Sequence, residues 1–145
     1  MTAAKTKPKP TSVDELLREK ARPEQLADCQ ALMDVLQRVT GAPPVLWSGG
    51  IVGYGRYGYR YDSGRTGEAA LVGFAVRGRE LVVYLGAGAE GPAQAALLAR
   101  LGPHRAGKGC LYLRRLAELD LGVLEALVAG AVAETRRRHP DGGAG

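Results

Sequence analysis

The chain has 145 residues, of which 46% are hydrophobic and 24% charged, and its formal net charge is +5. This length suits one domain, and the composition excludes the disordered and fibrous classes of protein. We expect one domain over residues 11–138 between disordered tails at residues 1–10 and 139–145. Apolar stretches are too short to cross a bilayer, so we expect no membrane partner. No apolar run follows the N-terminal lysines and prolines, which predicts a cytoplasmic location without a secretory signal.

Two helices are expected in the N-terminal part of the domain. Ser12 and Glu15 form a capping box, which predicts a short helix that ends near Lys20. Pro23 suits the first position of a second helix, and Gly41 supplies a C-terminal stop. The segment Ala42-Pro43-Pro44 that follows predicts an extended linker leading to Trp47.

Four strands and two more helices are expected in the rest of the chain. Alternating or continuous apolar residues predict strands at residues 51–61, 70–76, 81–85 and 110–114. Helical patterns cover residues 92–101 and 120–138, and residues 102–109 form a loop. The order ααβββαβα predicts an α+β fold with two layers, in which helices pack on a four-stranded, mainly antiparallel sheet.

Glycine-rich segments resemble nucleotide-binding motifs but lack their context. Residues 53–58 match G-x-G-x-x-G inside a strand, where no helix N-terminus follows to hold a pyrophosphate. Residues 86–91 match it between a strand and a helix, but Arg105 and Lys108 occupy the region where an acidic residue is needed. Residues 102–109 approach a P-loop, yet they run from helix to strand and lack the Ser or Thr that ligates magnesium. This loop is therefore a candidate for holding a small anion, not for hydrolysing a nucleotide.

The two cysteines, Cys29 and Cys110, show neither metal-ligand spacing nor a disulfide framework, so we expect free thiols. His104 is near Cys110 in the sequence, but a cysteine that opens a half-buried strand is typical of packing rather than catalysis. Two histidines and two isolated cysteines form no recognisable metal cluster. Glu15 and Glu19 have the helical spacing to hold a hard cation weakly, which is equally the spacing of a solvated face. No motif supports an enzyme, so we expect a binding protein.

Positive charge is concentrated in the middle of the sequence. Residues 51–115 contain 10 basic and 4 acidic residues, whereas residues 11–135 as a whole contain 14 of each. The basic segment can face phosphate or another anion, or it can be a solvated strand surface. Because residues 11–135 are formally neutral, we do not expect nucleic acid as a partner.

Six tyrosines fall in the expected strands, near a tryptophan and several arginines. Aromatic and basic side chains on a sheet can enclose a planar or anionic ligand, although the same tyrosines can simply pack across strands. Arg65 follows the first turn of the sheet and Lys108 lies in the glycine-rich loop, so a compact sheet can bring both to one end. The resulting candidate ligand site consists of Trp47, Tyr57, Tyr59, Arg65, His104 and Lys108.

An ordered set of short motifs extends over residues 12–132. The set includes Val39-Thr40-Gly41, Trp47, Gly53-Tyr54-Gly55, Tyr57-Gly58-Tyr59-Arg60-Tyr61, Ser63-Gly64-Arg65, Gly73-Phe74, His104, Gly107-Lys108, and Cys110-Leu111-Tyr112. In this order the motifs resemble the YdhG-like domain-of-unknown-function family, although the chain departs from the family pattern at Ala69-Ala70, Pro103 and Gly109. The resemblance implies a two-layer α+β fold. Some members of this group are described as frataxin-like iron chaperones for iron–sulfur cluster assembly, so the resemblance also implies iron as a ligand.

The sequence therefore leaves two functions open, with an enzyme of unknown type as a third that no motif supports. The first is an iron chaperone, which the resemblance implies and which needs a dense acidic surface that this sequence does not show. The second is a non-enzymatic protein that binds a small anionic or planar ligand through Tyr, Arg and Lys side chains. A small molecule or a metal is the expected ligand, and a homodimer is compatible with the sequence.

Overall fold

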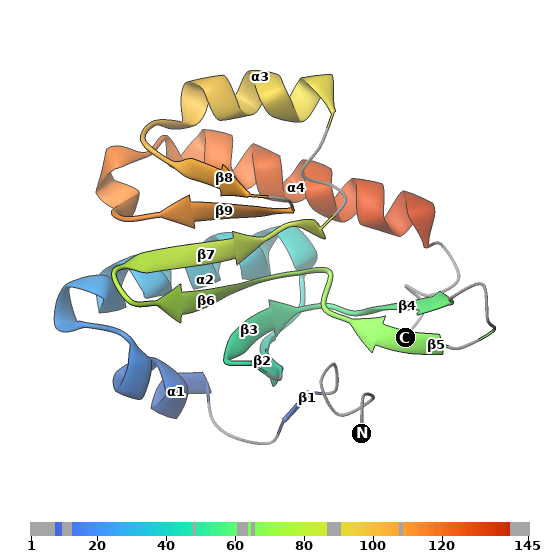
Figure 1. Cartoon of the computed structure of the whole chain (residues 1–145), viewed down its shortest axis with the longest axis horizontal. Helices are drawn as coiled ribbons and strands as arrows, with labels where there is room; N and C mark the ends of the chain where they lie inside the picture. The colour runs from blue at the N-terminus through green and yellow to red at the C-terminus, as the bar shows by residue number, and fades with distance from the viewer. Residues whose placement is uncertain are drawn as a thin grey trace.

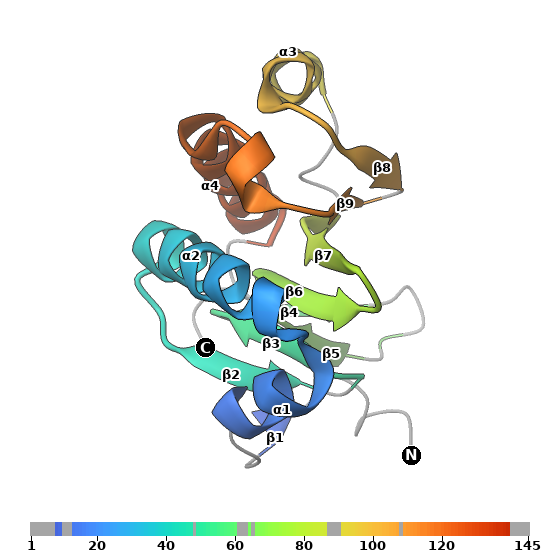
Figure 2. The same cartoon turned by 90° about the vertical axis from the view of Figure 1, so that its left-hand side faces the viewer.

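The computed structural model describes residues 8–9, 13–47, 49–60, 64, 66–86, 91–107 and 109–139. These residues form four α-helices and a large antiparallel sheet, so the expected α+β class and the four helices are confirmed. Helices α2 and α4 lie side by side against the same face of the sheet. Helix α3 packs on the side of α4 that is turned away from α2 (Figures 1 and 2). Among these residues, no helix is long and apolar enough to span a membrane.

The helices begin and end close to the residues that the sequence indicates. Gly41 ends α2 in the left-handed conformation, with φ of 68°, which glycine adopts without strain. Asp120 caps α4, because its Oδ1 atom accepts a hydrogen bond from the N–H of Val123 at 3.1 Å. Ser12, the expected cap of α1, lies outside the described residues. The helices are α1 Val13–Lys20, α2 Pro23–Thr40, α3 Pro92–Leu101 and α4 Leu121–Arg138, with a short 3₁₀ helix, η3, at Leu116–Glu118.

The strands of the main sheet follow the order β1-β2-β3-β6-β7-β9-β8, and each neighbouring pair is antiparallel. A separate two-stranded sheet, formed by β4 and β5, extends from one end of the main sheet (Figure 1). The strands are β1 Pro8–Lys9, β2 Pro44–Trp47, β3 Ile51–Tyr54, β4 Tyr57–Arg60, β5 Thr66–Ala69, β6 Val72–Arg77, β7 Glu80–Tyr84, β8 Arg105–Gly107 and β9 Cys110–Leu113.

The expected four-stranded sheet and the order ααβββαβα are wrong. Residues 44–113 contribute six of the described strands of the main sheet, and the two-residue β1 adds to its edge. Two of the additional strands come from segments expected to be irregular. The expected linker at residues 42–44 runs into β2, in which Trp47 pairs with Ile51, and the expected loop at residues 102–109 contains β8.

The single strand expected at residues 51–61 is also wrong, because the chain turns inside it. Gly55 has a φ of 67°, in the left-handed region that extended strands do not use. The turn separates β3, which pairs with β6, from β4, which pairs with β5. The sequence analysis missed β5 altogether.

The hydrophobic core lies between the main sheet and the helices. Alternate residues of the strands belong to one buried cluster with residues of α2 and α4, as the period of two of a strand requires. Fully buried members include Val52, Tyr54, Phe74, Leu81, Val83 and Leu113 from strands and Leu32, Leu36, Leu124, Leu127 and Val128 from helices.

One end of the main sheet gathers three connections that are distant in sequence. Strands β7 and β9 are antiparallel, so Leu81, just after the β6–β7 turn, pairs with Leu113 at the end of β9. The junction of α1 and α2 lies at the same end, on the left in Figure 1 and toward the viewer in Figure 2. Tyr84 and Cys110 pair at the opposite end, next to the turn between β8 and β9.

Candidate anion-binding pocket

Two of the three aromatic residues expected in the ligand site, Trp47 and Tyr57, pack against neighbouring side chains. Trp47 is only 4% exposed in β2, and a Cβ atom at Gly53 would lie 2.5 Å from its Cδ1 atom. Its Nε1 atom has no hydrogen-bond partner among the described residues. Tyr57 is half-buried in β4, and its ring centroid is 4.7 Å from that of His139, the residue that follows α4. Tyr59 also belongs to β4, but its side chain lies outside the description.

Two of the three basic residues of that expected site, Arg65 and Lys108, lie outside the described residues, so their convergence stays a prediction. His104 precedes β8 and is partly exposed, with its Nδ1 atom 2.8 Å from the carbonyl oxygen of Gly102. Strands β3, β6, β7 and β9 separate β2 from β8, so the structure does not bring Trp47 and His104 together.

A pocket that the sequence analysis did not find lies at the opposite end of the sheet from the β8–β9 turn. Its volume is about 540 Å³, and four arginines dominate its lining. The start of α2, the β6–β7 turn and the segment from the end of β9 to η3 form its walls. The lining residues are Arg22, Glu24, Gln25, Arg79, Arg114, Arg115 and Glu118, and we call this cavity the arginine pocket.

Gln25 holds two walls of the arginine pocket together. This side chain is only 3% exposed. Its Nε2 atom donates to the carbonyl oxygen of Gly78 at 3.0 Å, and its Oε1 atom accepts from the backbone N–H of Arg22 at 2.8 Å. A buried amide with both ends hydrogen-bonded has a fixed position. The start of α2 and the β6–β7 turn, which carries Arg79, are therefore tied to each other.

Asp28 ties the third wall to α2 in a similar way. Its Oδ2 atom accepts a hydrogen bond from the backbone N–H of Leu116 at 3.3 Å. Leu116 directly follows Arg114 and Arg115 and begins η3. The three segments that supply the arginines are thus cross-linked by side-chain hydrogen bonds before any ligand arrives, which lowers the entropy lost when a ligand binds.

The arginines of this pocket differ from others on the surface. Arg38 pairs with Glu125 and Arg105 with Glu80, each at 2.7 Å. By contrast, none of the four pocket arginines forms an ion pair with another residue in the described part of the chain, and all four are exposed. Four arginines and two glutamates give the lining a formal charge of +2. The first turn of α2 adds the positive end of a helix dipole.

The sequence carried only weak signals for this pocket. Each arginine stands next to a turn or a helix start, where a solvated charge is common. Their positions, 22, 79, 114 and 115, become neighbours only because β7 pairs with β9 and α2 begins beside the β6–β7 turn. No local pattern encodes that strand order.

The cysteines and acidic residues suggest no second chemistry. Cys29 and Cys110 are both free and buried, as expected. Burial, and secondly the charge of Asp28, raises the pKa of the Cys29 thiol to about 11. Cys110 contacts a tyrosine rather than His104, because its Sγ atom lies 3.4 Å from the Oη atom of Tyr112. Within the described ranges, no three His, Cys, Asp or Glu side chains are grouped so that they could hold a metal ion.

Comparisons with protein-family models, with curated proteins and with solved structures found no match.

Proposed function

We propose that this protein binds a small anionic ligand, bearing a phosphate or carboxylate group, in the arginine pocket. The observation that carries the proposal is the convergence of Arg22, Arg79, Arg114 and Arg115, without ion-pair partners among the described residues, on one cavity of about 540 Å³. This is a form of the binding function that the sequence left open, at a different place in the fold.

The chemistry of arginine supports an anion rather than a neutral ligand. The planar guanidinium presents paired N–H donors that match the two oxygens of a carboxylate or phosphate. Several such groups close together repel one another, and a bound anion removes that repulsion. Gln25 and Asp28 cross-link the backbone segments that carry the arginines, so an anion has to order only the exposed arginine side chains.

The two glutamates of the pocket narrow the class of ligand that it can bind. Glu24 and Glu118 line the same cavity as the arginines. The lining is still net positive, so it attracts a bare anion, and a ligand with hydroxyl or amino groups beside its anionic group would in addition donate hydrogen bonds to the glutamates. We therefore favour a small organic phosphate or acid with neighbouring hydrogen-bond donors. The iron chaperone stays a prediction from the resemblance, since no specific contact in the described residues favours it.

Calorimetric titration of the protein with pyrophosphate at low salt tests the proposal. Arg79→Ala and Arg114→Ala should each weaken binding at least about tenfold, because a hydrogen bond to a charged group contributes about 1.5–3 kcal/mol. Arg100→Ala is the matched control, since Arg100 is an exposed arginine on α3 outside the pocket. Equal losses in all three variants, or no saturable binding by the unmodified protein, would contradict the proposal.

A further inference from the structure

A second cavity lies beside the arginine pocket, and all the charged side chains in its lining are positive. Its volume is about 220 Å³. Lys20 and Arg77 are its charged side chains, Gly49 and Gly50 form its small-residue floor, and apolar residues of α1, β3 and β6 form its walls. We call this cavity the lysine pocket.

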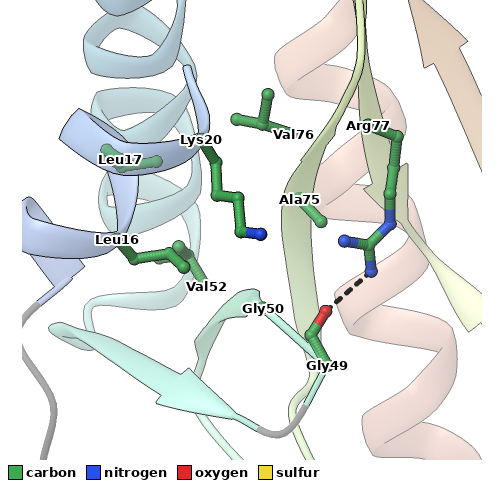
Figure 3. A pocket seen from close by; sticks show the side chains of 9 residues that line it. All are labelled: Leu16, Leu17, Lys20, Gly49, Gly50, Val52, Ala75, Val76 and Arg77. Carbon is green, nitrogen blue, oxygen red and sulfur yellow. Dashed lines mark hydrogen bonds between the residues drawn. The ribbon is translucent and has the colours of Figure 1, made fainter.

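Figure 3 shows how the two cations enter the lysine pocket. The ammonium group of Lys20 ends in the middle of the cavity above Gly50, and the guanidinium of Arg77 approaches from the other side of β6. Arg77 is held in place, because its Nη2 atom donates to the carbonyl oxygen of Gly49 at 2.8 Å. The Nζ atom of Lys20 is 3.9 Å from the Oε1 atom of Glu19, but both side chains are more than half exposed. An exposed ion pair of this kind contributes little to stability.

The two pockets lie on either side of one narrow ridge. Lys20 and Arg22 are two residues apart at the α1–α2 junction, and Arg77 and Arg79 are two residues apart at the β6–β7 turn. Since a residue spans at most about 3.6 Å, the Cα atoms of each pair are at most about 7 Å apart. Gln25 bonds both connections, so they touch at the ridge.

No large side chain of these two connections separates the pockets. The residue between Lys20 and Arg22 is Ala21, and the residue between Arg77 and Arg79 is Gly78. On the far side of the ridge from the arginine pocket lie two further cations and apolar walls that include Leu16 and Leu17.

We propose that the two pockets bind the two ends of one elongated ligand with an anionic group at each end and an apolar spacer between them. This inference rests on the proposed function, because the first anionic group occupies the arginine pocket. The second group pairs with Lys20 and Arg77, and the spacer contacts the apolar walls of the lysine pocket. The ligand class is a bis-phosphate, a phosphorylated acid or a dicarboxylate.

The test compares methylphosphonate, which has one anionic group, with a series of α,ω-alkane bisphosphonates of increasing spacer length. One spacer length should bind at least about tenfold more tightly than methylphosphonate, because the second group binds at high effective concentration. Lys20→Ala should reduce that bisphosphonate to the affinity of methylphosphonate and leave the binding of methylphosphonate unchanged. Arg77→Ala serves as a second variant with the same expectation, and melting temperatures check that both variants fold.

Arg18→Ala is the matched control, since Arg18 is an exposed cation on α1 that lines neither pocket. If methylphosphonate binds in an Arg114-dependent way but no bisphosphonate binds more tightly, the two-pocket inference is wrong and the proposed function stands. If Arg114→Ala affects neither ligand, both are wrong. If a single-stranded oligonucleotide binds more tightly than every bisphosphonate and depends on Lys20, the small-ligand class is wrong.

Discussion

Gln25 and Gly78 are 53 positions apart in the sequence, yet the Nε2 atom of Gln25 donates a hydrogen bond to the carbonyl oxygen of Gly78 at 3.0 Å. The same side chain accepts a hydrogen bond from the N–H of Arg22, so one buried amide joins the start of α2 to the β6–β7 turn. Both proposed subsites adjoin this connection. The relative position of the segments that line the arginine pocket and the lysine pocket thus depends on Gln25, a residue that carries no charge.

Gln25→Ala should lower both the stability and the anion affinity of the protein. The substitution removes the hydrogen bonds to the Gly78 carbonyl and the Arg22 N–H, and each contributes about 0.5–1.5 kcal/mol, because both residues are exposed and their backbone groups can bond to water instead. Urea unfolding measures the stability, and titration with pyrophosphate measures the affinity. Gln30→Ala, at an exposed position of the same helix, should change neither. Equal effects of the two substitutions would show that Gln25 does not organise the pocket.

Gly53→Ala should destabilise the protein by overpacking. A Cβ atom at this position would lie 2.5 Å from Cδ1 of Trp47 and 2.6 Å from the Cβ of Ala70, and neither neighbour is the end of a flexible chain. Inserting a methyl group into such a contact costs about 1–3 kcal/mol. Trp47 is the single tryptophan, so its fluorescence should also shift. Gly122→Ala, where a Cβ meets only Asp120 at 3.3 Å, should cost less, and the reverse ranking would contradict the packing of Trp47 on Gly53.

The two thiols should react slowly in the folded protein and quickly after unfolding. Cys29 is 1% exposed and Cys110 is 9% exposed, and the raised pKa of Cys29, about 11 against an ordinary 9.0, keeps its thiol neutral. Because the folded pKa is higher, Cys29 contributes its full stability below about pH 9 and loses it as the pH rises through about 11. Thiol titration with an aromatic disulfide should count two thiols in denaturant. Rapid native reaction of Cys29, or fewer than two thiols in denaturant, would contradict this account.

The carboxyl group of Glu134 should have a pKa well below that of an ordinary glutamate. Hydrogen bonds from Arg137 and then Arg138 lower the pKa of its carboxyl from 4.5 to about 2. Because the folded pKa is lower, this group stabilises the end of α4 above about pH 4.5 and loses that effect as the pH falls toward 2. Carboxyl NMR measures the midpoint. Replacing both arginines by glutamine should return the midpoint toward 4.5, and a midpoint near 4.5 in the unmodified protein would contradict the ion pairs.

Local chemistry explains which parts of the fold the sequence could predict. The helices begin and end where Pro23, Gly41 and Asp120 act on the adjacent backbone, so their bounds follow from a few neighbouring residues. The strands β2 and β8 show no such signal. They are strands only because β3 and β9 supply hydrogen-bond partners, and a partner is a property of the folded chain.

The same distinction applies to the binding site. Arg65, His104 and Lys108 are expected to border one surface with the strand tyrosines, because a compact sheet can bring the first turn and the glycine-rich loop to one end. The four arginines come instead from three segments that only the β7–β9 register and the Gln25 hydrogen bonds bring together. An exposed arginine beside a turn looks the same in sequence whether or not other arginines converge on it.

The measurement that tests the central claim most directly is an NMR titration of isotope-labelled protein with pyrophosphate, in which each backbone amide reports its own surroundings. We predict saturable shifts that are largest for Glu24, Gln25, Arg79 and Arg115, around the arginine pocket. Gly107 and Gly109, at the opposite end of the sheet, should move little. Largest shifts at Gly107 and Gly109 would instead place the anion beside Lys108, and would contradict binding in the arginine pocket.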